Sequence, residues 1–128
     1  MKILIVDDEA TSREILKKLI GVHGNHQITT AQNGDEAWTY LDDPNRVFDL
    51  VFLDINMPGT DGLQVLGRIR QAAHLRSVKV VMCTAATDRA TVAKAIQLGT
   101  QHYLVKPCSE EAVVAKLKQI ETIMASAS

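Results

Sequence analysis

The sequence predicts an α/β fold, with a parallel sheet between two layers of helices. Short β-branched apolar runs alternate five times with amphipathic stretches, a pattern typical of βαβ units. Three of the runs are almost continuously apolar, as expected of parallel strands that are covered on both faces. A length of 128 residues fits one domain with one core.

Five short runs are the expected strands. They cover residues 3–6, 27–31, 50–53, 78–82 and 102–105. The run at 27–31 is the most polar, which favours a position at an edge of the sheet.

Five amphipathic stretches are the expected helices, at residues 11–22, 35–42, 62–72, 88–98 and 109–124. The apolar faces expected to enter the core carry Ile15, Leu16, Leu19 and Ile20 in the first helix, Trp38 in the second, and Val92, Ala95 and Ile96 in the fourth. Gly21, Gly24 and Gly99 lie near expected helix ends, and Ser109 fits the N-cap of the last helix.

Composition and charge exclude several classes of protein. The chain is 46% apolar and 23% charged with a net charge of −1, which is ordinary for a globular protein and predicts neither nucleic-acid nor membrane partners. No apolar run approaches the ~20 residues of a membrane helix or the hydrophobic region of a signal peptide. Cys83 and Cys108 form no CxxC motif and are expected to be buried or inert thiols in the cytoplasm.

Acidic and polar residues follow the expected strands. Because ligands of open α/β sheets bind at the carboxyl ends of the strands, these are the positions where a site is expected. Asp7 and Asp8 end the first run, Asp54 the third, Thr84 the fourth and Lys106 the fifth. The sequence therefore predicts three carboxylates, one hydroxyl and one ammonium at one edge of the sheet.

Three neighbouring carboxylates need a compensating cation, or some of them must be protonated. Two unit charges ~4 Å apart interact by roughly 4 kcal/mol at an effective dielectric constant of about 20. An open oxygen site with few protein ligands suits Mg²⁺, which takes its other ligands from water and phosphate. The Lys106 ammonium and Thr84 hydroxyl can both bind phosphoryl oxygens, and Asp54 is a candidate nucleophile for an aspartyl phosphate.

Several motifs occur in order along the chain: Ile5-Val6-Asp7-Asp8-Glu9, Asn33-Gly34, Asp49-Leu50-Val51-Phe52-Leu53-Asp54, Met57-Pro58-Gly59-Thr60-Asp61-Gly62, Thr84-Ala85, Leu98-Gly99 and Tyr103-Leu104-Val105-Lys106-Pro107. With them the sequence resembles the receiver domains of two-component response regulators, and is similar to the stand-alone chemotaxis kind. The resemblance implies a flavodoxin-like (βα)5 three-layer sandwich with strand order 2-1-3-4-5. It implies a receiver domain over residues 1–124, with 125–128 as a tail or the start of a linker.

The resemblance also implies a role for each residue of the site. Asp54 is the phosphoacceptor. Mg²⁺ is bound directly by Asp8, Asp54 and the backbone carbonyl of Asn56, and partly through water by Asp7. Lys106 contacts the phosphoryl group and, before modification, Asp54.

Two further residues are implied in switching, Thr84 through its hydroxyl and Tyr103 as the coupled aromatic side chain. The bond between Lys106 and Pro107 is often cis in this family.

The implied phosphodonor is a histidine kinase or a phosphotransfer protein. The implied receiver of the signal is an effector protein or a fused output domain, bound at the face of the helix at 88–98, the strand at 102–105 and the helix at 109–124. A homodimer through that face is an open alternative. The resemblance implies no enzymatic activity beyond the chain's own phosphorylation and dephosphorylation.

Two other functions use similar residues. A Mg²⁺-dependent phosphatase that works through an aspartyl phosphate needs a second acid two residues after the nucleophile, where this chain has Asn56. A flavin binder needs a phosphate loop rich in Ser, Thr or Gly after the first strand, where this chain has Asp7-Asp8-Glu9.

Taken one at a time, the site residues also have structural interpretations: Asp7 and Asp8 as helix caps, Asp54 as a turn residue, Thr84 as a strand end, Lys106 as a surface lysine, and Tyr103 as core packing. His23, His26, His74 and His102 show no metal-ligand spacing and are expected at the surface or in loops. Arg68, Arg70 and Arg76 are expected to form a solvated face.

Overall fold

A computed structural model describes residues 1–55, 57, 62–85, 89–100 and 102–127. Its elements in chain order are β1 (Lys2–Val6), α1 (Ala10–His23), β2 (Gln27–Ala31), α2 (Gly34–Leu41), β3 (Leu50–Asp54), α3 (Gly62–Gln71), a 3₁₀ turn η1 (Ala73–Leu75), β4 (Lys79–Ala85), α4 (Arg89–Gln97), β5 (His102–Lys106) and α5 (Glu110–Ala127).

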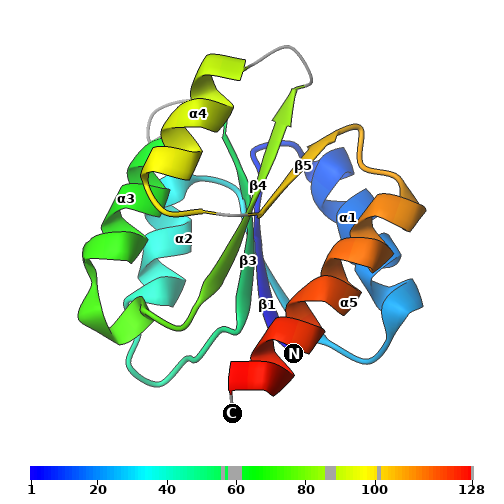
Figure 1. Ribbon diagram of the computed structural model, residues 1–128, viewed down its shortest axis with the longest axis horizontal. Helices are drawn as coiled ribbons and strands as arrows, with labels where there is room; N and C mark the ends of the chain where they lie inside the picture. Colours follow the sequence, from blue (N-terminus) through cyan, green and yellow to red (C-terminus); the bar gives the residue numbers. More distant parts are fainter. Residues whose placement is uncertain (56, 58–61, 86–88, 101, 128) are drawn as a thin grey trace.

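The five strands form one parallel sheet in the order β2-β1-β3-β4-β5, which confirms the predicted fold class and strand order. Helices α1 and α5 cover one face, and α2, α3 and α4 cover the other (Figure 1). Strand β2 lies at an edge, as its polar sequence predicted.

Two apolar layers pack on the two faces of the sheet. Because successive strand side chains point to opposite faces, Leu50 and Phe52 of β3 pack with α1 and α5, while Val51 and Leu53 pack with α2 and α3. Burial on both faces explains why the central strands are apolar at every position.

The helix boundaries differ from the prediction by a few residues. Gly21 lies inside α1, which ends at His23 with Gly24 as its C-cap. Gly99 has a φ of 95° two residues after the end of α4, a left-handed conformation that glycine adopts without strain. Helix α5 continues to Ala127, so residues 125–127 are helical. Ser109 accepts a hydrogen bond from the Ala112 amide at 3.1 Å, which confirms it as the N-cap.

Two residues assigned to the core by helical spacing are exposed. Ile15 is 50% exposed and Ile96 is 57% exposed. Both predictions were wrong because spacing identifies the apolar stripe of a helix but not how much of it a neighbouring element covers. Trp38 is partly buried, and the Arg68 guanidinium lies 4.0 Å from its ring centroid.

The part of the chain that the structure describes contains no helix that is both long and apolar enough to cross a membrane.

Gly62 begins α3 directly beneath the end of β3. A Cβ at this position would lie 2.7 Å from Ile55 Cα and still closer to the Asp54 carbonyl oxygen. The Gly62 amide donates to the Ile55 carbonyl at 2.9 Å, so the two backbones cannot separate without losing this bond. Because residue 62 has no side chain, α3 can begin in contact with the end of β3, and the hydrogen bond holds it there.

We predict that Gly62→Ala lowers the free energy of unfolding by about 1–3 kcal/mol, the range for forcing extra atoms into a packed interior. Urea unfolding measures it. Gly21→Ala is the matched control because its Cβ would meet nothing within 4 Å, and alanine inside a helix is favoured over glycine by about 1 kcal/mol. A Gly62→Ala variant as stable as the wild type would show that the close approach is not required.

Candidate functional site

The charged residues predicted at the strand ends do meet at one edge of the sheet. Asp54 and Lys106 are the last residues of β3 and β5, and Asp7 follows β1. By the alternation of strand side chains, all three continue the face that α1 and α5 cover. The parallel sheet therefore gathers residues that are far apart in the sequence.

Lys106 contacts two of the carboxylates. Its Nζ lies 3.0 Å from Asp7 Oδ2 and 3.2 Å from Asp54 Oδ2. Asp7 and Asp54 are each only 5% exposed. One ammonium thus neutralises part of the charge of two buried acids, and the contact expected between Lys106 and Asp54 is present.

The environment of Lys106 favours its charged form. Burial alone would lower the pKa of this ammonium, but the hydrogen bond to Asp7 and the charge of Asp54 outweigh burial and raise the pKa above its usual value. Lys106 therefore stays protonated throughout the neutral range.

Asp8 supplies a third carboxylate. Asp7, Asp8 and Asp54 each offer an oxygen, and these oxygens lie within 4.8 Å of one another. Three carboxylates and one ammonium leave a net charge of −2 at the cluster. Hard oxygen donors with this charge, open to solvent at Asp8, fit one divalent cation of the Mg²⁺ type. Asn56, the expected fourth ligand, lies outside the described residues.

The local backbone orients Asp7. Its Oδ1 accepts the Glu9 amide at 2.9 Å, and its carbonyl accepts from Arg13 Nη1 at 2.8 Å. The N-cap of α1 is Glu9, without a side-chain capping bond. The interpretation of Asp7 and Asp8 as helix caps is therefore wrong, and Asp7 Oδ2 is directed to Lys106 instead.

Thr84 is buried at 1% exposure near the carboxyl end of β4. It pairs in register with Val105 of β5, so it shares a face of the sheet with Val105 and, two residues earlier, Tyr103. Tyr103 is 49% exposed, which rules out the alternative of core packing. The bond between Lys106 and Pro107 is cis, as the resemblance implied.

The two cysteines lie beside this cluster as free thiols. Cys83 pairs in register with Asp54, and both cysteines line a cavity of about 350 Å³ that Asp7 and Lys106 also border. A hydrogen bond from Cys83 lowers the pKa of Cys108 to about 7, so its thiolate is partly formed at neutral pH. Cys83 is buried, as expected, and Cys108 is partly exposed, while the expectation that the thiols are inert stays a prediction.

The histidines divide into three cases. His74 is exposed, as expected, and lies 3.6 Å from Asp42. His102 is buried at 7% exposure, so its surface assignment was wrong. His23 and His26 come together with Glu121 of α5, which sequence spacing could not show because one of the three partners comes from a distant helix.

Comparisons with known proteins agree with this geometry. A family model described as the response regulator receiver domain matches residues 3–118. Over 119 residues the chain is 39% identical to the transcriptional regulatory protein ResD of Bacillus subtilis, a match that covers 93% of this chain. It is 32% identical over 120 residues to the chemotaxis protein CheY1 of Helicobacter pylori, covering 94% of this chain.

A crystal structure of NtrX from Brucella abortus matches the fold with a TM-score of 0.86 at 29% identity, over 98% of this chain. The relatives differ in length. The match covers 47% of ResD and 28% of the NtrX chain, but 96% of CheY1.

We predict that Asp8→Asn raises the free energy of unfolding in EDTA by about 1 kcal/mol, the interaction of two unit charges ~4 Å apart in a largely aqueous environment. In millimolar Mg²⁺ the gain shrinks or reverses because the intact three-acid site binds the cation more tightly. Urea unfolding in the two buffers measures both values. Glu14→Gln, an exposed acid of α1 outside the cluster, should change little. A loss of stability for Asp8→Asn in EDTA would contradict repulsion at this site.

Proposed function

Because the chain belongs to the response regulator receiver domain family, we propose that Asp54 accepts a phosphoryl group from a histidine kinase or a phosphotransfer protein. The observation that supports this most directly is the buried Asp54 carboxylate, in contact with Lys106 and grouped with Asp7 and Asp8. The chain then catalyses only its own phosphorylation and dephosphorylation and acts on a partner through binding.

In the proposed reaction an Asp54 carboxylate oxygen attacks the phosphorus atom of a phosphohistidine. An O–P bond forms, and the P–N bond breaks as the imidazole leaves with its electron pair. Lys106, already 3.2 Å from Asp54 Oδ2, places its ammonium where the phosphoryl oxygens carry negative charge.

Asp7, Asp8 and Asp54 are the side chains that would hold Mg²⁺, with the Asn56 carbonyl as a further ligand. When bound, this ion supplies charge neutralisation for the phosphoryl oxygens. The net charge of −2 at the cluster and its hard oxygen donors support this choice of cofactor.

Thr84 and Tyr103 are proposed to transmit the modification. The Thr84 hydroxyl donates a hydrogen bond to a phosphoryl oxygen, and its displacement lets Tyr103 move from its half-exposed position. Shifting a switch from 1:99 to 99:1 takes about 5.5 kcal/mol. A hydrogen bond to a charged group contributes about 1.5–3 kcal/mol, so about two to four new bonds are needed.

The face beside Tyr103 is suited to a protein partner. Its exposed apolar side chains are Ile96 and Leu98 at the end of α4, and Tyr103 and Val105 of β5. Apolar patches of this kind mark interaction surfaces. We propose that the α4-β5-α5 face binds an effector protein or a fused output domain, with a homodimer as the alternative occupant. The unequal lengths of ResD and CheY1 keep both kinds of partner open.

The limits and location of the domain are also proposals. Met124 of α5 still packs against the core, while Ala125 and Ser126 are exposed. This supports a receiver domain of residues 1–124 followed by a tail or linker. The free thiols are consistent with action in the reducing cytoplasm.

We predict that an acyl phosphate adds one phosphoryl group to the wild-type chain in Mg²⁺ and none in EDTA. Intact-mass spectrometry measures the adduct. Asp54→Asn should carry no adduct because it lacks the nucleophilic oxygen, while Asp49→Asn, an acid at the other end of β3, should react as wild type. A folded wild-type chain without any adduct would refute the proposed function.

We also predict that Thr84→Ala is phosphorylated but no longer switches. In a Trp38→Phe background, Tyr103→Trp gives a fluorescent reporter whose emission should shift to the blue when phosphorylation buries it. The shift should disappear in Thr84→Ala while the mass adduct remains. An undiminished shift in Thr84→Ala would exclude this hydroxyl as the link.

A further inference from the structure

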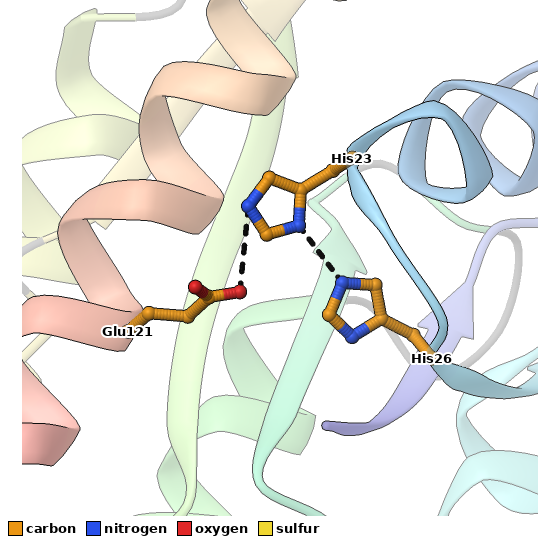
Figure 2. A group of neighbouring side chains, drawn as sticks. All are labelled: His23, His26 and Glu121. Carbon is orange, nitrogen blue, oxygen red and sulfur yellow. Dashed lines mark hydrogen bonds and ion pairs between the residues drawn. The ribbon is translucent and has the colours of Figure 1, made fainter.

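A second group of metal-ligating side chains lies away from the acidic cluster. It comprises His23, the last residue of α1, His26 just before β2, and Glu121 of α5 (Figure 2). Each offers one ligand atom, and these atoms lie within 4.8 Å of one another. The group sits at the amino ends of the strands, since His26 also contacts the amino group of Met1 at 2.9 Å.

The three side chains are already directed toward one another. His23 Nδ1 lies 2.9 Å from His26 Nε2, and His23 Nε2 lies 3.4 Å from Glu121 Oε1 (Figure 2). Figure 2 shows His23 between the other two. The two imidazole rings are stacked, with an angle of 10° between their planes.

Packing holds the group in place. The His23 side chain is only 10% exposed, while Glu121 is 44% exposed and leaves an opening to solvent. Helices α1 and α5 share one apolar layer, with Ile20 and Ile120 both fully buried in it. The histidine and the carboxylate are thus held on two packed helices, so most of the entropy cost of assembling the site is met by folding.

From this arrangement we propose that His23, His26 and Glu121 bind one divalent transition-metal ion of the Zn²⁺ type. Two imidazoles and one carboxylate form a common zinc ligand set, with the fourth position left for water. Ligand atoms on one tetrahedral ion with bonds of ~2.1 Å lie about 3.4 Å apart. The contacts to His26 and Glu121 use the two different nitrogens of His23, of which one ion takes only one. One ligand atom from each of the three residues lies within 4.8 Å of the others, so small side-chain rotations, above all of the half-exposed Glu121, bring them onto one ion.

The types of metal ligand also distinguish this site from the acidic cluster, because the two sets favour different ions. Imidazole nitrogens favour Zn²⁺, Cu²⁺ and Ni²⁺, whereas the carboxylates of Asp7, Asp8 and Asp54 favour Mg²⁺. An ion at this site would link the end of α1 to α5.

The test is calorimetric titration of the full chain with Zn²⁺ in excess Mg²⁺, which occupies the acidic cluster. We expect one Zn²⁺ per chain. His26→Gln and Glu121→Gln should each weaken binding at least ~10-fold, and both positions are exposed enough for these variants to fold. His74→Gln is the matched control because His74 forms an exposed histidine–carboxylate pair with Asp42 at 3.6 Å.

The cysteine pair is the competing zinc site, and Co²⁺ as a probe tells the two apart. The proposed site should give the visible spectrum of nitrogen and oxygen ligands and should survive Cys108→Ser. Thiolate absorption that disappears in Cys108→Ser, or wild-type affinity in both His26→Gln and Glu121→Gln, would overturn the proposal. So would the absence of saturable binding. None of these results bears on the phosphorylation of Asp54, which the mass adduct tests separately.

Discussion

The contact of Lys106 with Asp7 and Asp54 is the interaction on which the carboxyl edge of the sheet depends. It joins the ends of three strands, because Asp7 follows β1 while Asp54 and Lys106 end β3 and β5. Two carboxylates at 5% exposure would repel one another strongly in a medium of low dielectric constant. The ammonium between them makes their burial tolerable, and it leaves a cluster that still carries excess negative charge.

Backbone packing positions the strand ends that carry these charged side chains. Gly62 lets α3 begin in contact with the last residues of β3, while parallel pairing sets Asp54 opposite Cys83 and Thr84 opposite Val105. Main-chain hydrogen bonds therefore fix where the backbone of each of these residues lies at the edge. A site assembled on strand ends in this way is more rigid than one assembled on loops.

Much of the fold and of the acidic cluster could be predicted from the sequence. A strand is recognisable from a short run of neighbouring residues, and the residues that follow it are candidates for a site at the carboxyl ends of the strands. The runs before Asp7, Asp54 and Lys106 identify strands, and a parallel sheet necessarily brings their carboxyl ends together. Whether the apolar face of a helix is buried depends on elements that lie far away in the sequence. Ile96 has the spacing of a core residue but is 57% exposed, so none of the elements that the structure describes covers it.

The group of His23, His26 and Glu121 could not be predicted from the sequence for the same reason. His23 and His26 lie three residues apart across the end of a helix, a spacing that carries little information on its own. Glu121 completes the group only because α1 and α5 pack side by side on one face of the sheet (Figure 1). The acids at the other end of the sheet were recognisable because they lie where a strand ends, Asp7 and Asp8 after β1 and Asp54 at the end of β3.

The proposed switch has to work with a small change in total charge. The cluster carries −2, and one Mg²⁺ would bring it near zero. Phosphorylation replaces the single charge of Asp54 by a group of about −1.5 to −2, so the net change is about one unit or less. That change is too small to drive the shift from 1:99 to 99:1, about 10⁴-fold in the equilibrium constant, by repulsion alone at an edge open to water.

What changes most is the position of the acceptor oxygens, which move from the Asp54 carboxylate outward to the phosphoryl group. A hydrogen-bond donor close to the site, such as the buried Thr84 hydroxyl, can respond to that change in position, whereas a charge spread over several atoms cannot. The signal would therefore pass through hydrogen-bond geometry, and the exposed side of β5 at Tyr103 is where it would reach a partner.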